Sequence, residues 1–259
     1  MDFNKLYHEP NLETMARMPE CFVDLTVTSP PYDGLRDYNG YSFPFEDIAK
    51  ELYRVTKQGG VLVWIVNDAT IDGNETGTSF KQALFFKEIG FNLHDTMIYA
   101  KEQIAFPSSN RYHQAFEYMF VLSKGKPKAV NLIQDRLNVS FGRSGKVNAR
   151  MKNGEVKKGE KEVVIREYSE RLNWWIIYNQ ERGIENEHPA VFSRQLAYDH
   201  IRTWSNENDL VYDCFMGSGT TAVAAISANR NWIGSEISEE YCNIAKQRLE
   251  PYVNNLFTS

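Results

Sequence analysis

The sequence predicts an α/β fold built on a mostly parallel sheet with helices on its faces. Two runs of buried-type residues, 24–28 and 209–213, each lead directly into a turn, as strands covered on both faces do. The first run stops at Pro30-Pro31, because proline has no N–H and fixes its own φ. The second runs into a glycine turn and then a helix. We therefore expect both turns at the carboxyl edge of the sheet, where open α/β sheets bind ligands.

The other elements follow from hydrophobic periodicity and from start and stop signals. Amphipathic spacing predicts a helix at 45–57, which Gly59-Gly60 ends. The segments 94–101 and 116–123 are expected to form an antiparallel pair at the edge of a seven-stranded sheet. In chain order the predicted strands are 5–8, 24–28, 61–66, 94–101, 116–123, 209–213 and 232–236, and the predicted helices are 12–18, 45–57, 78–88, 194–204, 222–228 and 239–250.

Hydroxyl residues stand at the start of four predicted helices. Thr78, Ser193, Thr220 and Ser238 are the expected N-caps, because a side-chain oxygen there accepts from an otherwise unpaired N–H group. Pro251 is expected to end the last helix. The tryptophan pair Trp174-Trp175 is predicted to lie in a further strand that anchors the preceding segment to the core.

Length and cysteine content limit the class of protein. The chain has 259 residues, enough for one large α/β domain. It has no run of eighteen apolar residues and no apolar core of a signal peptide, so we expect neither a membrane span nor secretion. Its three cysteines form no Cys-x-x-Cys pair, which favours a reducing cytoplasm and argues against a zinc site.

The first turn, Ser29-Pro30-Pro31-Tyr32, suits attack by a weak exocyclic amine. The lone pair of such an amine is delocalised into its ring, and acceptors against its N–H bonds pull the nitrogen towards a nucleophilic, tetrahedral shape. The Ser29 hydroxyl and the Pro30 carbonyl are acceptors of this kind. Tyr32 offers a face on which an extruded base can stack. The alternative is that the two prolines simply terminate a strand.

The second turn suits a nucleoside ligand. Gly217 and Gly219 allow the backbone to approach a ligand without a Cβ in the way. Asp213, at the end of the strand, can accept from N–H groups of the turn or from a ligand amino group. Glu236 follows Gly219 by 17 residues and ends the next strand, where an acid accepts the hydroxyls of a ribose. No lysine follows Gly219, which argues against a phosphate-binding P-loop.

Together the two turns resemble the catalytic and cofactor motifs of the amino-group DNA methyltransferases that use S-adenosylmethionine. In that family the motifs read Ser/Asp/Asn-Pro-Pro-Tyr and Asp-Pro-Phe-x-Gly-Ser-Gly-Thr, and the order found here resembles its circularly permuted beta group. The resemblance covers nearly the whole chain. It implies a Rossmann-like class I methyltransferase fold, S-adenosyl-L-methionine as cofactor, no metal, and a cytoplasmic enzyme of bacterial or phage origin.

The same resemblance implies roles for individual residues. Ser29, Pro30, Pro31 and Tyr32 would be catalytic. The cofactor would contact Asp213, Phe215, Gly217, Ser218, Gly219, Thr220 and Glu236, with His188-Pro189 forming the other wall of its pocket. The sequence departs from the family in having Cys214 in place of a proline, and Pro10 where an aspartate near the adenine is expected, so that Glu9 or Asn11 would have to substitute.

Charge is unevenly distributed along the chain. The net charge is −5, but residues 124–171 carry 13 Lys+Arg against 6 Asp+Glu, a net of +7 on an acidic body. Such a segment favours phosphate binding, although a solvated surface loop has the same composition. We therefore divide the chain into a catalytic part at 1–123, a target-recognition insert at 124–187 and a cofactor-binding part at 188–259. The implied partner is double-stranded DNA; a restriction endonuclease and a second copy of the chain stay open.

The sequence leaves more than one function open. Ser-Pro-Pro-Tyr goes mostly with cytosine N4 in the family and Asp-Pro-Pro-Tyr mostly with adenine N6, so Ser29 favours N4 over N6 methylation. A nicotinamide oxidoreductase would use the glycine turn and Glu236 but gives the Ser29 turn no role. A DNA-binding module without catalysis also fits the basic segment, and the Ser29 turn would serve methylation of RNA or protein as well.

Overall fold

The structure, a computed structural model, divides into two compact units. It describes residues 1–31, 43–101, 110–146, 148–157, 159, 162–177 and 193–254. The first unit comprises Met1–Asn131 and Asn173–Ser259, and the second comprises Leu132–Leu172. Every buried apolar side chain among the described residues belongs to the first unit, which therefore holds the hydrophobic core.

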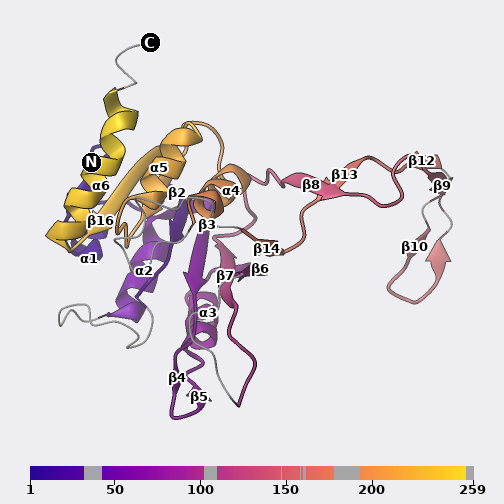
Figure 1. The fold of residues 1–259 in the computed structure, drawn as a ribbon, viewed down its shortest axis with the longest axis horizontal. Helices are drawn as coiled ribbons and strands as arrows, with labels where there is room; N and C mark the ends of the chain where they lie inside the picture. Colours follow the sequence, from indigo (N-terminus) through magenta and orange to yellow (C-terminus); the bar gives the residue numbers. More distant parts are fainter. Residues whose placement is uncertain are drawn as a thin grey trace. The chain divides into compact units, whose positions relative to one another are not determined.

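A large sheet runs through the first unit (Figure 1). Its described strands lie in the order β1-β16-β15-β2-β3-β7-β6-β14. Their bounds are β1 Lys5–His8, β2 Val23–Thr28, β3 Thr56–Val66, β6 Asn92–Ala100, β7 Phe116–Ser123, β14 Trp174–Ile176, β15 Leu210–Asp213 and β16 Asn231–Glu236. All neighbours are parallel except that β7 runs antiparallel to both β3 and β6.

The predicted α/β fold with a mostly parallel sheet is confirmed, but two details of the sheet were wrong. The described residues form eight strands rather than seven, and the antiparallel strand lies inside the sheet rather than at its edge. Both differences come from β14, which pairs in parallel with β6 and thereby covers the edge that β6 and β7 were expected to form. Trp175 is 5% exposed and fixes β14 to the core, as the tryptophan pair predicted.

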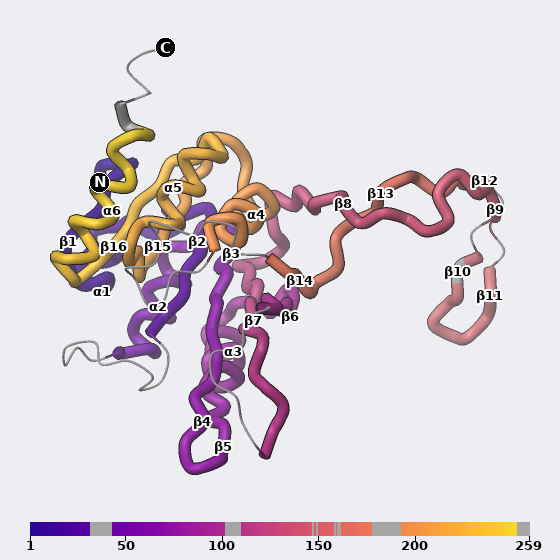
Figure 2. The backbone as a smooth tube through the Cα atoms, in the orientation of Figure 1, coloured from indigo at the N-terminus to yellow at the C-terminus, as the bar shows by residue number. Residues whose placement is uncertain are grey.

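Helices cover both faces of this sheet, as Figure 2 shows. One apolar cluster joins α1 Asn11–Ala16, α2 Phe45–Val55 and α3 Thr78–Glu88 to the sheet. The other joins α4 Arg194–Trp204, α5 Thr220–Ser227 and α6 Glu239–Asn254 to its opposite face. A short hairpin, β4 Thr70–Ile71 with β5 Asn74–Glu75, follows β3. None of the described helices is long and apolar enough to cross a membrane.

Several helix ends differ from the prediction, and α2 ends at Val55 because Gly59-Gly60 lies inside β3. Gly219, not Thr220, is the N-cap of α5, because its φ of 86° is available to glycine, and the helix begins at Thr220. Thr78 is the first residue of α3 rather than its cap, and the Asp68 carboxylate accepts from the Ser79 N–H at 2.8 Å. Helix α6 continues through Pro251 to Asn254. Tyr252 packs on the core, and the Arg194 Cζ atom lies over its ring, 5.7 Å from the ring centroid. These two contacts hold the last turn of α6.

The second unit is a series of short antiparallel strand pairs. They are β8 Gln134–Leu137 with β13 Tyr168–Glu170, β9 Ser144–Lys146 with β12 Glu162–Val164, and β10 Ala149–Arg150 with β11 Val156–Lys157. The unit is shorter than the predicted insert 124–187, because the described residues on both sides of it pack on the first unit. The Asn131 side chain donates to the Ser205 carbonyl at 3.1 Å. The role of the second unit in target recognition stays a prediction.

Candidate active site

The two predicted turns meet at one edge of the sheet. Strands β2 and β15 are parallel neighbours, with Tyr212 opposite Thr26, so the turns that follow them leave from the same edge. The Thr28 hydroxyl, directly before Ser29, donates to the Asp213 carboxylate at 2.6 Å. The expectation that segments almost two hundred residues apart come together is confirmed.

The turn predicted to be catalytic, 29–32, is described up to Pro31. Ser29 and Pro31 are partly exposed, whereas Pro30 is buried. Exposure therefore begins at Ser29, because Thr28 before it is fully buried. Tyr32 lies outside the described residues.

The turn from Cys214 to Gly219 is held by its neighbours on every side. Gly217 and Gly219 have φ values of 51° and 86°, in the left-handed region. The buried Asn11 side chain donates to the Cys214 carbonyl at 3.1 Å. The Arg248 guanidinium of α6 donates to the Ser218 hydroxyl at 2.7 Å and to the Thr220 hydroxyl at 3.3 Å. The partly exposed Phe215 packs on Phe43, with 5.8 Å between the two ring centroids. The turn is therefore held in place by contacts within the protein.

Asp213 is buried beneath this turn. It is 1% exposed and accepts from Thr28, from the Phe215 N–H at 3.0 Å and from the Thr221 hydroxyl at 2.6 Å. Burial raises the pKa of this carboxyl to about 6, while the three hydrogen bonds act in the opposite direction. The structure shows the first role predicted for Asp213, contact with an N–H group of the turn, and contact with a ligand amino group stays a prediction.

Glu236 faces the same turn from the end of β16. One carboxylate oxygen accepts from the Gly217 N–H at 2.8 Å, and the other from the Ser238 N–H at 2.9 Å. Burial raises its pKa, while these N–H groups lower it. Each carboxylate oxygen has two lone pairs, so the partly exposed group retains acceptor capacity for ligand hydroxyls.

Three residues that sequence reasoning did not assign to the site contribute to it, and so does Asn11, one of the two candidates named beside Pro10. Thr28 and Thr221 bind Asp213, Arg248 binds the glycine turn, and Asn11 binds the Cys214 carbonyl. The sequence contains a partial signal, because Thr28 and Thr221 each adjoin a predicted motif. Of the other predicted residues, His188 and Pro189 lie outside the described part of the chain. Glu9, the alternative to Asn11, binds Arg17 and Thr14 instead.

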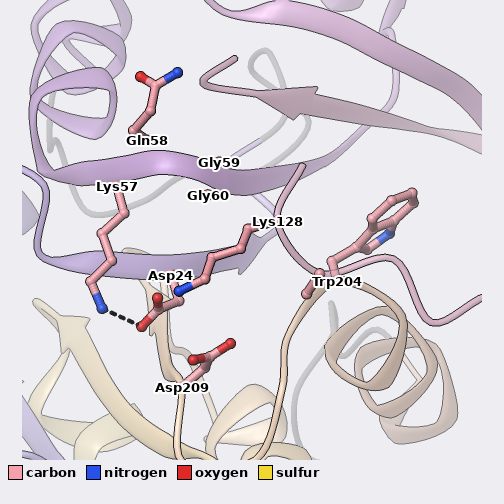
Figure 3. Close-up of a pocket in the computed structure, with 9 residues that line it drawn as sticks. Asp24, Lys57, Gln58, Gly59, Gly60, Lys128, Trp204 and Asp209 are labelled. Carbon is pink, nitrogen blue, oxygen red and sulfur yellow. Dashed lines mark hydrogen bonds and ion pairs between the residues drawn. The ribbon is translucent and has the colours of Figure 1, made fainter. Parts of the chain in front are cut away.

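A small pocket lies at the opposite, amino edge of the sheet, where β2, β3 and β15 begin (Figure 3). Its empty volume is about 310 Å³, including open solvent. The Lys57 ammonium and the Leu210 N–H already pair with the Asp24 carboxylate there, at 2.6 and 3.0 Å. No group of three metal-ligating side chains occurs among the described residues.

Comparison with known proteins identifies the class. A family model described as DNA methylase, for N6 and N4 enzymes, matches residues 23–247. The chain therefore belongs to this DNA methylase family. It is a site-specific DNA methyltransferase that uses S-adenosylmethionine.

Individual relatives agree over most of the chain. The orphan methyltransferase M.BamHII of Bacillus amyloliquefaciens is 56% identical over 241 residues, covering 90% of this chain and 91% of the relative. Among solved structures, the complex of M1.HpyAVI with S-adenosylmethionine has a TM-score of 0.65 at 24% identity and covers 95% of this chain and 99% of the other. PvuII DNA methyltransferase has a TM-score of 0.68 at 21% identity, with 98% and 92% covered. These two likenesses show the fold.

The residues at the edge of the sheet fit S-adenosylmethionine. Glu236 has capacity for ribose hydroxyls, and helix α5 has no acidic residue in its first turn, so its N-terminus suits a carboxylate. The left-handed glycines and the absence of a Cβ at Gly234 give the turn its close packing, since a Cβ there would lie 2.9 Å from Met216 Cγ. When bound, this cofactor supplies an electrophilic methyl group.

Proposed function

We propose that this enzyme methylates the exocyclic N4 of a cytosine flipped out of double-stranded DNA. The observation that carries the proposal is Ser29, a neutral hydroxyl at the first position of the catalytic turn, partly exposed next to the cofactor turn. A neutral acceptor suits the amino group of cytosine, and the likeness to PvuII methyltransferase, described as cytosine-N4-specific, supports the choice.

The chain's own residues orient the amino group. The Ser29 hydroxyl and the Pro30 carbonyl accept its two N–H bonds and expose the nitrogen lone pair. Pro31 stiffens the turn, and Tyr32 stacks on the flipped base, which offsets part of the unstacking cost of a few kcal/mol.

Cofactor binding falls to the second turn. Glu236 accepts from the ribose hydroxyls, Phe215 lies beside the cofactor, and Gly217, Ser218, Gly219 and Thr220 surround its methionine part. His188-Pro189 forms the opposite wall. Asp213 contributes indirectly, because its two oxygens already bind three groups of the protein.

The alternative is adenine N6, for which the same acceptors would serve. The two can be separated by expressing the chain in a host without amino-methylated bases and sequencing its DNA with a readout that distinguishes them. We expect N4-methylcytosine at one short sequence and none with Ser29→Ala. N6-methyladenine at that sequence would establish the alternative, and unmodified DNA from an active preparation would exclude both.

The partner we propose is duplex DNA, bound through the basic second unit. The name of the orphan methyltransferase relative favours an enzyme that acts without an endonuclease. A homodimer remains a prediction, to be checked by light scattering.

A further inference from the structure

The Asp213 carboxylate joins the catalytic turn to the cofactor turn. Its Oδ1 accepts from the Thr28 hydroxyl and its Oδ2 from the Thr221 hydroxyl, both at 2.6 Å. Thr28 is the last residue of β2 and directly precedes Ser29, and Thr221 lies in the first turn of α5. The three side chains are 0–1% exposed, so water does not compete for these bonds.

An ionised carboxylate can accept all of these hydrogen bonds at once. The Phe215 N–H adds a third bond to Oδ1 at 3.0 Å, so three donors from three segments converge on two oxygens. An asparagine would place an NH₂ group against one of the threonines, which would then have to reorient. Retaining a buried charge has a free-energy cost, and burial raises the pKa of Asp213 to about 6. The arrangement therefore calls for a role beyond packing.

We propose that Thr28, Asp213 and Thr221 are positioning residues that fix the distance between the acceptor turn at Ser29 and the methyl-donor turn. None of the three touches the reacting atoms. Thr28 sets the end of β2 against Asp213, and Thr221 sets the start of α5 against the same carboxylate. A misplacement of about 1 Å between reacting groups costs on the order of 100-fold in rate, so these bonds affect turnover more than cofactor affinity. The inference rests on the proposed role of Ser29.

Thr28, Asp213 and Thr221 form a triad whose hydrogen bonds depend on pH. The titratable groups near Asp213 are Glu236 on β16, whose charge raises its pKa, and Tyr212 and Cys214 on its own segment, whose pKa values burial raises well above the usual range. These two stay neutral around pH 6, so Asp213 is the group of the triad that changes charge there. A proton on Oδ2 would donate to the Thr221 hydroxyl, which would then have to turn its own hydrogen from Asp213 towards the Val27 carbonyl, 3.5 Å away.

Thr26 provides a matched control. It lies two residues before Thr28 in the same strand, it is also 0% exposed, and its hydroxyl has no hydrogen-bond partner among the described residues. Replacing Thr26 by valine removes a buried hydroxyl from β2 without touching Asp213. Any loss common to Thr26→Val and Thr28→Val reports on the strand and not on the triad.

The experiment measures total transfer of labelled methyl groups to unmethylated genomic DNA, with cofactor affinity measured separately by calorimetry. Counting label on either base keeps this test independent of the choice between cytosine and adenine. We expect Thr28→Val and Thr221→Val to lower kcat by ~10- to 100-fold with cofactor Kd within about threefold, and Thr28→Ser and Thr221→Ser to recover most of the rate. Thr26→Val should keep the wild-type kcat.

Asp213→Asn should lower kcat further, and it should lack the fall in kcat below about pH 6 that we expect of the wild type. Melting curves check that every variant is folded. If a valine variant is unfolded, the comparison of the corresponding serine variant with the wild type still tests the proposal. A wild-type kcat in both valine variants would overturn the proposal. An equal loss of kcat in the serine, valine and Thr26 variants would also overturn it, and so would variants that lose only cofactor affinity.

Discussion

At the scale of single residues, Asp213 shows how a functional arrangement opposes stability. Burial raises the pKa of its carboxyl to about 6, above the usual 3.8. A raised folded-state pKa means that the folded protein binds a proton more tightly than the unfolded chain, so the stabilising contribution is complete below about pH 4 and is lost as the pH rises through 6. The ionised form that accepts three hydrogen bonds is therefore the less stable one.

This predicts a pH-dependent difference between the wild type and Asp213→Asn, which cannot bind that proton. The free energy of unfolding of the wild type, relative to the variant, should fall by ~2 kcal/mol between pH 4.5 and pH 7.5. Urea denaturation of both proteins at the two pH values measures it. A difference that does not change with pH would contradict the assigned burial of the charge.

We propose that Ser29 serves methyl transfer and Glu236 serves cofactor binding, and single substitutions should separate these two roles. We expect Ser29→Ala to lower kcat by ~100-fold or more, because one acceptor for the amino group is lost, with cofactor Kd nearly unchanged. Glu236→Gln should mainly weaken cofactor binding, by about 10-fold, since a charged acceptor is replaced by a neutral one. Steady-state kinetics and calorimetry measure the two effects, and equal damage in both variants would refute the division.

At the scale of elements, the start of α5 depends on Gly219. Its φ is 86°, and a Cβ there would lie 3.1 Å from the Ala245 Cβ of α6. Gly73, between β4 and β5, has a similar φ of 77° with nothing within 4 Å, so it isolates the backbone strain from the contact. We expect Gly73→Ala to lower the free energy of unfolding by ~1 kcal/mol and Gly219→Ala by ~2 kcal/mol or more.

The Gly219→Ala variant should also bind S-adenosylmethionine more weakly, because the added methyl group separates α5 from α6 at the cofactor turn. Chemical denaturation and calorimetry test both statements, with Gly73→Ala as the control for each. Equal destabilisation of the two variants would show that α6 yields at Ala245 and does not define the turn.

The sequence predicted most elements because their signals are local. Strand β2 is a buried run that proline ends, and the glycine turn has a recognisable motif, so both were found with their common edge. Helix caps were less predictable. Gly219 takes the place of Thr220 because of its backbone φ, and Asp68, eleven residues before Ser79, accepts the hydrogen bond expected of Thr78. The bonds of Asp213 to Thr28 and Thr221 join different elements, so the position of each threonine next to a predicted motif was only a partial signal for them.

At the scale of the whole molecule, the second unit adds no described residue to the apolar core. Its boundaries were not predictable from charge, because the basic run starts at Lys124 while the chain leaves the first unit only after Asn131. The backbone between 124 and 131 pairs with the sheet, as the Lys128 N–H bond to the Gly59 carbonyl at 2.9 Å shows. The composition of a segment shows its charge, whereas the boundary of the second unit depends on which residues contact the sheet of the first.

The first unit should therefore fold without the second. The Arg171 N–H donates to the Ile133 carbonyl at 2.8 Å, so residues 134–170 can be replaced by Asn-Gly as a two-residue hairpin turn. We expect this variant to melt cooperatively and to bind S-adenosylmethionine with Kd within about threefold of the wild type, while losing specific DNA binding. Loss of cofactor binding in a folded variant would show that the second unit helps to form the pocket.

The charge of the second unit leads to a prediction about DNA binding as a function of salt. Lys146, Lys152 and Lys157 are exposed side chains of this unit, suited to contact phosphates. Each phosphate contact contributes about 0.9 to the slope of log K against log salt, because a condensed counterion is released. Replacing the three by glutamine should weaken binding and reduce the slope by up to about 3, whereas Lys87→Gln on α3 serves as a control of equal charge change per site. Fluorescence anisotropy between about 50 and 200 mM salt measures the slope.

An unchanged slope with the triple variant would mean that Lys146, Lys152 and Lys157 do not contact the phosphates. The DNA-binding surface would then have to be sought on the first unit.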